Sequence, residues 1–269
     1  MVVRSGQDRA VLIDAGPVPA LVDGCLRRLG VHHLDLVLLT HHHGDHVLGL
    51  PGALHGRDVA QMLISPLAEP AENAALVRRW AAEARIPLAI GWAGSTGVAG
   101  MDGVAGESAQ RQGWLVRWRL LAPRDPPATG AGNDGGDGTT VNESSLVTEL
   151  DAESPAGPVQ VLGLGDLETA GQQELAARIG SGLDPLGGPV DVVKVAHHGS
   201  ARQDPALYRE LGARVALIGV GAGNDYGHPA PSALAMLHAA QLSAFRTDLA
   251  GDLAVVPAAD GALRVVTRR

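Results

Sequence analysis

Short apolar segments alternate with helix-like segments along this chain, and this alternation limits the folds that it can adopt. The apolar segments that resemble buried strands cover residues 9–16, 34–40, 60–65, 158–166, 190–198 and 214–221. Helix-like segments cover residues 20–30, 74–86, 168–179 and 204–212. Buried strands that alternate with helices are typical of α/β proteins. The chain is therefore predicted to have an α/β fold.

Several of the predicted strands end in polar side chains that can bind a metal. Asp14 ends the first, a histidine-rich stretch follows the second, Asp166 ends a later one, and His197 and His198 end the next. Binding sites in open α/β sheets assemble at strand ends. We therefore expect a functional site there.

The stretch THHHGDH, residues 40–46, has the most concentrated metal-binding chemistry. In an extended backbone His41 and His43 project to the same side, His42 points away, and Asp45 and His46 follow on a turn. These nitrogen and oxygen donors suit two adjacent divalent metal sites with room for water or substrate. A surface histidine tract is the alternative, but the preceding buried strand and the fixed offset of the aspartate favour metal binding.

Composition limits the ligands and partners. Cys25 is the lone cysteine of the 269 residues, so one chain can form neither a disulfide nor a thiolate metal cluster. The net charge of −8 argues against a general polyanion-binding surface, so any contact with DNA must be local. No segment approaches the roughly 20 apolar residues of a membrane span, and no signal peptide follows Met1.

Residues 123–140 are rich in proline, glycine and aspartate and are predicted to form a flexible loop. A domain boundary is the competing interpretation. Because the motifs on both sides of this segment would have to meet, a single domain over residues 1–269 is expected.

The motif THHHGDH resembles the Thr-His-x-His-x-Asp-His signature of the metallo-β-lactamase fold, and VLIDAGP resembles the strand before it. The downstream segments VNESSLV, LGLGDLE, VVKVAHHGS, GNDYGHPAPSAL and FRTDLAGDLAVV resemble, in this order, the metallo-β-lactamase-like domain of ComEC-family DNA-uptake proteins. This resemblance implies an αββα sandwich, with two mixed sheets packed face to face and helices outside. It also implies that the natural protein is attached to a membrane and that a channel part of that protein is a partner.

Asp166 is expected to bridge two metals, because Gly165 before it permits a tight turn at the end of a strand. Capping the following helix is the alternative role for Asp166. Strand alternation predicts that only one of His197 and His198 is a ligand. The resemblance to esterases of the wider superfamily assigns the metal to His198 and transition-state stabilisation or proton donation to His197, although the reverse assignment stays open.

The remaining site residues are predicted to bind substrate or to orient ligands. Gly199 and Ser200 offer a backbone amide and a hydroxyl to a phosphate at the start of the next helix. The resemblance favours a substrate contact for His228, with metal binding second, and Asp14 is expected to orient a ligand histidine or the loop. Asn142 and Ser145 are expected to line the same pocket. The complete prediction is metal ligands His41, His43, Asp45, His46, Asp166 and His198; catalytic residues His197, His228 and Asp45; and substrate-binding residues Gly199, Ser200, Asn142 and Ser145.

The chain has no histidine between His55 and His197, so the third imidazole of the first metal site in β-lactamases and glyoxalases is missing. Oxygen atoms are harder ligands than imidazole nitrogens, so a site with more oxygen ligands makes manganese and magnesium candidates beside zinc. This difference argues against classical β-lactam hydrolysis.

The two-metal chemistry predicts a metal-dependent phosphodiesterase or nuclease with two divalent ions. The resemblance to ComEC-family proteins implies that it acts on DNA, either the single strand entering the channel or the strand lost during uptake. A hydrolase of small esters, of phosphocholine or thioester type, is one alternative. A catalytically silent module that guides single-stranded DNA is another. The low aromatic content and the acidic charge count against a strand-binding module and also weaken the nuclease interpretation.

Two departures from the ComEC-like pattern stand out. The Gly-Gln-Gly-Asp segment that usually precedes residues 9–16 is missing, so the first family strand is expected to be truncated and the strand at residues 9–16 to lack its partner. Glu143 stands where the family commonly has Asn or Asp. A carboxylate near a phosphate would be unfavourable unless it faces a metal or solvent.

Overall fold

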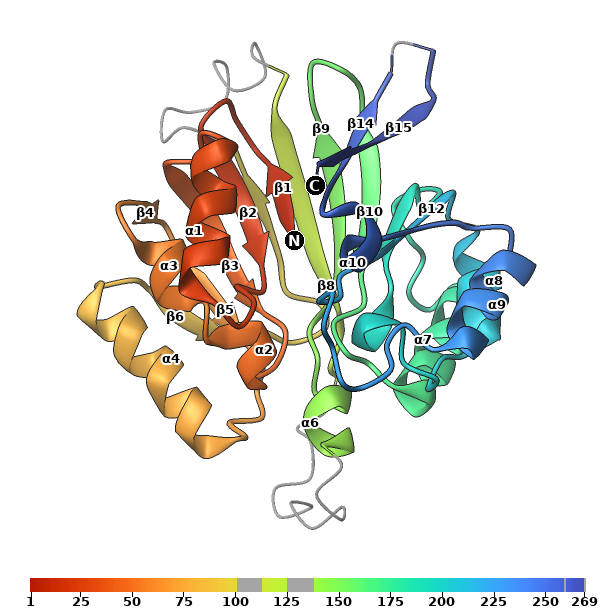
Figure 1. The fold of residues 1–269 in the computed structure, drawn as a ribbon, viewed down its shortest axis with the longest axis horizontal. Helices are drawn as coiled ribbons and strands as arrows, with labels where there is room; N and C mark the ends of the chain where they lie inside the picture. The colour runs from red at the N-terminus through yellow and green to blue at the C-terminus, as the bar shows by residue number, and fades with distance from the viewer. Residues whose placement is uncertain (101–112, 125–137, 259, 269) are drawn as a thin grey trace. The chain divides into compact units, whose positions relative to one another are not determined.

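A computed structural model of the protein describes residues 1–100, 113–124, 138–258 and 260–268 (Figure 1). These residues form two compact units. Unit 1 comprises Met1–Leu146 and Ala152–Pro155, and unit 2 comprises Val147–Asp151 and Ala156–Arg269.

Unit 1 contains a mixed sheet with the strand order β1-β2-β3-β5-β6 and with β4 paired to β3. Strand β1 is antiparallel to β2, and the other pairs are parallel. The strands span Val2–Arg4 (β1), Arg9–Ile13 (β2), His33–Leu39 (β3), Asp58–Val59 (β4), Met62–Ile64 (β5) and Leu88–Ile90 (β6). The mostly apolar sequences of β2 and β3 suit central parallel strands that are buried on both faces.

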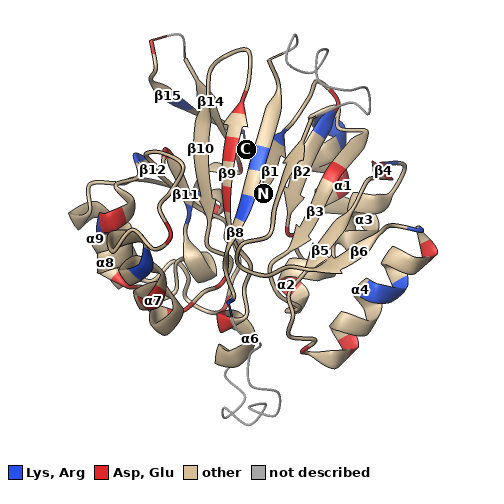
Figure 2. Ribbon diagram, turned by 180° about the vertical axis from the view of Figure 1, so that it is seen from behind, with Lys and Arg blue, Asp and Glu red and all other residues tan. Residues whose placement is uncertain are grey.

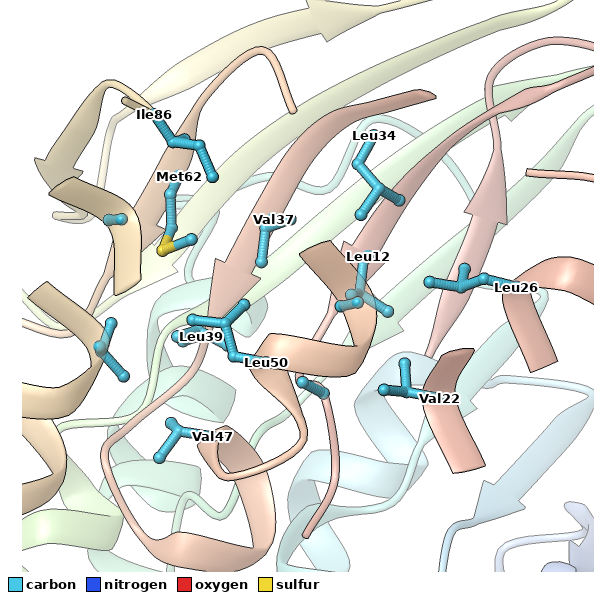
Figure 3. Close-up of a cluster of buried hydrophobic side chains, with 14 of the residues drawn as sticks. Leu12, Val22, Leu26, Leu34, Val37, Leu39, Val47, Leu50, Met62 and Ile86 are labelled. Atoms are coloured by element: carbon cyan, nitrogen blue, oxygen red, sulfur yellow. The ribbon is translucent and has the colours of Figure 1, made fainter. Parts of the chain in front are cut away.

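The helices of unit 1 span Pro19–Arg28 (α1), Gly44–Val47 (α2), Leu50–Leu54 (α3), Ala71–Glu83 (α4) and Thr139–Glu143 (α6). Helices α1, α2, α3 and α4 contribute apolar side chains to one core with this sheet, and Figure 3 shows part of that core. Helix α1 buries Val22 and Leu26, four positions apart on one face. Burial of each such side chain contributes about 1.5–3 kcal/mol to stability.

Helix α4 shows the same amphipathic pattern. It buries Ala74, Val77 and Ala81 and exposes acidic and basic residues on its other side (Figure 2). The last strands of unit 1, β7 (Thr96–Ala99) and β8 (Leu115–Ala122), form an antiparallel pair.

Unit 2 contains the strands β13-β12-β11-β10-β9 in that order, with β10 to β13 parallel to one another. They span Val147–Glu153 (β9, whose last two residues belong to unit 1), Val159–Gly163 (β10), Val192–Lys194 (β11), Val215–Ile218 (β12) and Ser243–Arg246 (β13). An antiparallel hairpin follows, with strands Asp252–Pro257 (β14) and Leu263–Arg268 (β15).

The helices of unit 2 connect its parallel strands. They span Thr169–Gly180 (α7), Pro205–Leu211 (α8), Pro231–Ala239 (α9) and Thr247–Ala250 (α10), and a 3₁₀ turn covers Ala196–Gly199. Helix α8 has sequence signals at both ends. The Asp204 carboxylate accepts hydrogen bonds from the Ala206 and Leu207 amides, and Gly212 ends the helix with φ +56°.

The structure confirms the predicted fold class, a mixed α/β protein with more than one mixed sheet. Each segment predicted as a strand or a helix contains one, from β2 and α1 to β12 and α8. Face-to-face packing of two sheets and a single domain over residues 1–269 stay predictions.

Two expectations need correction. The strand at residues 9–16 does not lack a partner, because β2 pairs with β1 through Val2–Leu12, Val3–Val11 and Arg4–Ala10. The first residues of the chain are apolar enough to supply this strand. The predicted loop at residues 123–140 lies largely outside the described residues, and its last two residues already belong to helix α6.

Candidate metal centre

The first histidine cluster, His41, His43 and His46 with Asp45, lies in unit 1 between the end of β3 and helix α2. The parallel pairing of β2 and β3 places Asp14, which follows β2, beside Thr40, which follows β3. The Asp14 carboxylate accepts a hydrogen bond from the Thr40 backbone amide at 2.8 Å and contacts the Thr40 hydroxyl. Adjacent strand ends thus hold the start of the cluster.

His41 and His43 turn toward each other, as their spacing predicts. His41 Nε2 lies 3.0 Å from His43 Nδ1, and Ser145 Oγ lies 3.4 Å from His41 Nδ1. Two ring nitrogens this close can share a proton or direct their lone pairs at one ion. Gly138 lies against His43, since a Cβ added to this glycine would be 3.0 Å from His43 Cε1.

His46 is buried and is oriented by Asp14. Its Nδ1 lies 2.9 Å from Asp14 Oδ2, and its Nε2 lies 3.6 Å from Asp45 Oδ2. When a carboxylate accepts a hydrogen bond from the Nδ1–H group, the lone pair of Nε2 is available to a metal. Many ligand histidines are oriented in this way. Asp14 therefore occupies the orienting position expected of it.

His42 points away from this cluster. Its Nδ1 lies 2.9 Å from the Leu67 carbonyl oxygen, and Asn73 donates a hydrogen bond to the His42 backbone carbonyl. Burial lowers the pKa of His42 below its ordinary value, although the Leu67 contact acts in the opposite direction. His42 is a neutral interior residue, in agreement with the expected structural role.

The second histidine cluster, His197, His198 and His228 with Asp166, lies in unit 2. Asp166 follows β10 on a turn in which Gly165 has φ +56°, and its side chain is 3% exposed. The N-cap of α7 is Glu168 rather than Asp166. The alternative role of Asp166 as a helix cap is therefore wrong, and the carboxylate faces the histidines instead.

His197 and His198 do not end a strand, so the alternation argument applied to them was wrong. Strand β11 ends at Lys194, and the two histidines lie in the 3₁₀ turn with φ of +47° and +51°. This left-handed conformation is rare outside glycine and costs about 1–3 kcal/mol per residue. It directs both rings toward Asp166, whose Oδ2 lies 3.9 Å from His197 Nε2 and 3.5 Å from His198 Nε2.

Different partners hold the two rings. His198 Nδ1 lies 2.6 Å from the Gly219 carbonyl oxygen, which can only accept, so this nitrogen carries the proton and Nε2 keeps its lone pair. His197 Nδ1 lies 3.4 Å from Glu168 Oε1, and the other oxygen of this buried carboxylate accepts a hydrogen bond from Arg202 at 2.6 Å. The protonation of His198 Nδ1 favours it as the metal ligand.

Gly199 and Ser200 do not start a helix as expected, because α8 begins at Pro205. Gly199 has φ +78°, and a Cβ there would lie 2.7 Å from Pro229 Cβ, so the residue needs to be glycine. The buried Ser200 hydroxyl accepts a hydrogen bond from the Arg202 backbone amide at 3.3 Å. Gly199 and Ser200 thus stabilise the turn. Their contact with a phosphate stays a prediction.

His228 approaches the turn from the loop after β12. Its ring centroid lies 5.4 Å from that of His197. Asn224 holds the His228 backbone through two hydrogen bonds, donating to its carbonyl at 2.8 Å and accepting from its amide at 3.0 Å. Burial and the neighbouring His197 and His198 lower the pKa of His228, and Asp166 opposes this shift.

The structure thus brings the predicted residues together in two groups, one in each unit. Ser145 joins the first cluster, and Asn142 is buried on the adjoining helix α6. Glu168 and the Gly219 carbonyl were missed by the sequence analysis. Glu168 occupies the N-cap position of α7 without a side-chain capping hydrogen bond, and glutamate is not a typical N-cap residue, so the sequence gives no signal for its contact with His197. A backbone carbonyl has no sequence signal at all.

The donor atoms in each unit are of types that bind divalent metals. Asp45 and His46 in unit 1 and Asp166 and His198 in unit 2 each offer one ligand atom, from an imidazole or a carboxylate. Imidazole nitrogen suits zinc, and carboxylate oxygen suits manganese and magnesium. Both His46 and His198 have their Nδ1 atoms engaged, as residues that bind a metal through Nε2 require.

The match to known families decides which fold this is. A model of the metallo-beta-lactamase superfamily matches residues 1–218. The chain belongs to this superfamily. It is also 26% identical over 231 residues to ComE operon protein 3 of Bacillus subtilis (strain 168), a match that covers 83% of this chain. This similarity supports the resemblance to ComEC-family proteins. The match covers 25% of that relative's length.

Among the helices that the structure describes, none is both long and apolar enough to cross a membrane.

Proposed function

We propose that this chain is a metal-dependent phosphodiesterase that acts on DNA and that it is the hydrolytic part of a ComEC-like competence protein. The observation that carries the proposal is the orientation of His46 and His198. Asp14 and the Gly219 carbonyl hold their Nδ1 atoms and leave both Nε2 atoms to bind metal. Membership in the metallo-beta-lactamase superfamily and the similarity to ComE operon protein 3 give independent support.

We assign the metal ligands in two sets, one from each cluster. His41, His43, Asp45 and His46 form the first set, and Asp166 and His198 form the second. When bound, two divalent ions activate a water molecule and neutralise the charge that develops on phosphoryl oxygens. Zinc, manganese and magnesium are the candidate ions.

The other residues act on the substrate. His197, held by Glu168, stabilises the transition state or donates a proton to the leaving oxygen, and His228 contacts the phosphate from its loop. The Gly199 amide, the Ser200 hydroxyl, Asn142 and Ser145 line the phosphate site. Asp45 contributes to catalysis as well as to metal binding.

The charge of the chain limits how it can hold DNA. A net charge of −8 does not provide a broad basic footprint, so the contact is confined to the strand near the scissile phosphate. A single strand reaches such a confined site more readily than a duplex. We propose single-stranded DNA as the substrate and a membrane-channel part of the natural protein as the partner that delivers it.

The test is cleavage of a labelled single-stranded oligonucleotide by metal-stripped protein after Mn²⁺, Mg²⁺ or Zn²⁺ is restored. We expect activity to return with at least one of these ions and to be absent in the Asp45→Ala/His46→Ala variant. The matched control is Asp58→Ala/His55→Ala, which replaces the same residue types where the side chains are 88% and 78% exposed.

Other outcomes separate the rival functions. Hydrolysis of bis(p-nitrophenyl) phosphate without cleavage of DNA would indicate a small-ester hydrolase. Binding of metal and of single-stranded DNA without hydrolysis of either substrate would indicate a silent guiding module. Either result would overturn the proposed nuclease activity.

A further inference from the structure

Tyr226 is unusually exposed for an aromatic residue of this chain. The chain has four tryptophans, two tyrosines and one phenylalanine. Tyr226 is 85% exposed, whereas the other tyrosine, Tyr208, is completely buried. Every tryptophan and the phenylalanine are at least partly buried. A large exposed aromatic ring in an aromatic-poor protein is a candidate contact for a ligand.

The ring of Tyr226 lies beside the second histidine cluster. It is stacked on His228, with ring centroids 6.1 Å apart and planes inclined by 22°, and His228 in turn lies 5.4 Å from His197. The two Asn224 hydrogen bonds fix the His228 backbone. A flat aromatic surface is therefore held next to residues assigned to the phosphate, and its exposed area remains available.

We infer that Tyr226 forms a stacking site for an unpaired nucleobase of the substrate, adjacent to the scissile phosphate. The inference rests on the proposed function and specifies the part of the substrate that is recognised besides the phosphate. Aromatic side chains bind single strands of varied sequence because every base has a π-face to stack on. Base stacking here requires no basic groove, which agrees with the acidic composition of the chain.

A base stacked on Tyr226 must be unstacked from a neighbouring base, since the ring contacts the face that this neighbour covers inside a duplex, and a single strand allows such unstacking more readily. Tyr226 therefore selects single strands over duplexes. The hydroxyl group is not needed for stacking, so phenylalanine can replace tyrosine whereas alanine cannot. Sequence preference is expected to be weak.

The experiment measures binding and cleavage separately. Binding of a labelled single-stranded oligonucleotide to metal-stripped protein is followed by fluorescence anisotropy, and cleavage is followed with the ion that best restores activity. We expect Tyr226→Ala to weaken binding and to lower kcat/KM by about tenfold, in the range known for loss of one stacked base. Tyr226→Phe should behave like the wild type.

Three controls exclude indirect effects. Leu183→Ala removes another side chain of unit 2 that is 74% exposed and should change neither quantity. An oligonucleotide with abasic sites on both sides of the scissile phosphate should be bound and cleaved equally by the wild type and Tyr226→Ala. Thermal unfolding of each variant checks that its fold is retained.

The outcomes distinguish this inference from the proposed function. Cleavage by the wild type with no change in Tyr226→Ala would overturn the stacking site and leave the phosphodiesterase intact. Base-dependent binding that Tyr226→Ala weakens, without cleavage by the wild type, would support the stacking site and contradict the nuclease. A wild type that neither binds nor cleaves the strand would overturn both.

Discussion

The two histidine clusters use different means to orient the same type of side chain. In the first cluster the histidines follow a strand, His43 has an extended backbone, and the Asp14 side chain holds His46. In the second cluster His197 and His198 both have left-handed backbones, and a backbone carbonyl holds His198. In the first cluster the left-handed residue is the orienting Asp14 (φ +57°), which acts through its side chain, whereas in the second cluster the histidines themselves have the left-handed backbone.

This difference predicts how each cluster should respond to mutation. A cluster held by side chains weakens when an orienting side chain is replaced. A cluster held by a strained turn weakens when the turn can relax, because the strain of about 1–3 kcal/mol per left-handed residue must be offset by surrounding contacts. The following changes test this comparison.

The largest effect is expected when one imidazole is removed from each cluster. His46→Ala and His198→Ala should each reduce phosphodiesterase activity to that of the metal-stripped protein, because each removes a donor atom of the proposed ligand set. Activity against a phosphodiester with each ion restored is the measurement. Substantial activity in only one variant would show that its cluster does not supply a required ligand.

The next effect separates the adjacent histidines of the second cluster. His197→Ala should lower turnover by about 10²–10⁴-fold, as expected for loss of a positioned proton donor, with metal affinity close to that of the wild type. His198→Ala should lower metal affinity itself. Metal titration beside turnover distinguishes the two, and the opposite pattern would assign the metal to His197.

A smaller effect is expected when the first cluster loses its orienting carboxylate. Asp14→Asn should weaken metal binding by about 10- to 100-fold, because the amide holds the Nδ1 proton of His46 less strongly. The control Asp58→Asn changes a carboxylate that is 88% exposed and should have no effect. Equal metal affinities in all three proteins would refute the role assigned to Asp14.

The smallest effect on activity concerns the turn of the second cluster, where stability is the quantity that changes most. Gly182→Ala and Gly199→Ala replace glycines with φ of +74° and +78°, but only the Cβ at Gly199 meets a close neighbour, Pro229. We expect Gly182→Ala to destabilise the protein by about 1–2 kcal/mol from backbone strain. Gly199→Ala should lose about 1–3 kcal/mol more from the close contact.

Chemical denaturation of both glycine variants measures this difference. Gly199→Ala should also lower activity, since movement of residue 199 displaces His198. If the two substitutions were equally destabilising, the contact with Pro229 would not constrain the turn.

The fold class, most strands and helices, and the first cluster could be predicted from local sequence patterns. Apolar segments of strand length alternate with helical segments, and this alternation predicts the fold class. His41 and His43 follow a strand, and because side chains alternate sides in extended backbone, their spacing predicts that they project to the same side. The signals of α8, from the Asp204 cap to Gly212, are equally local. Such signals depend on neighbouring residues in the sequence, so they can be interpreted without knowledge of distant contacts.

The arrangement of the second cluster depends on contacts between distant parts of the chain and could not be predicted from local sequence. The segment before His197 reads as one continuous strand, but the strand ends at Lys194 and both histidines adopt left-handed conformations. No residue type in that segment predicts this turn. The turn depends on contacts of His198 with Gly219 and of Gly199 with Pro229, from later in the chain. Local propensity is weak compared with such packing, so the orientation of these imidazoles could be seen only in the folded chain.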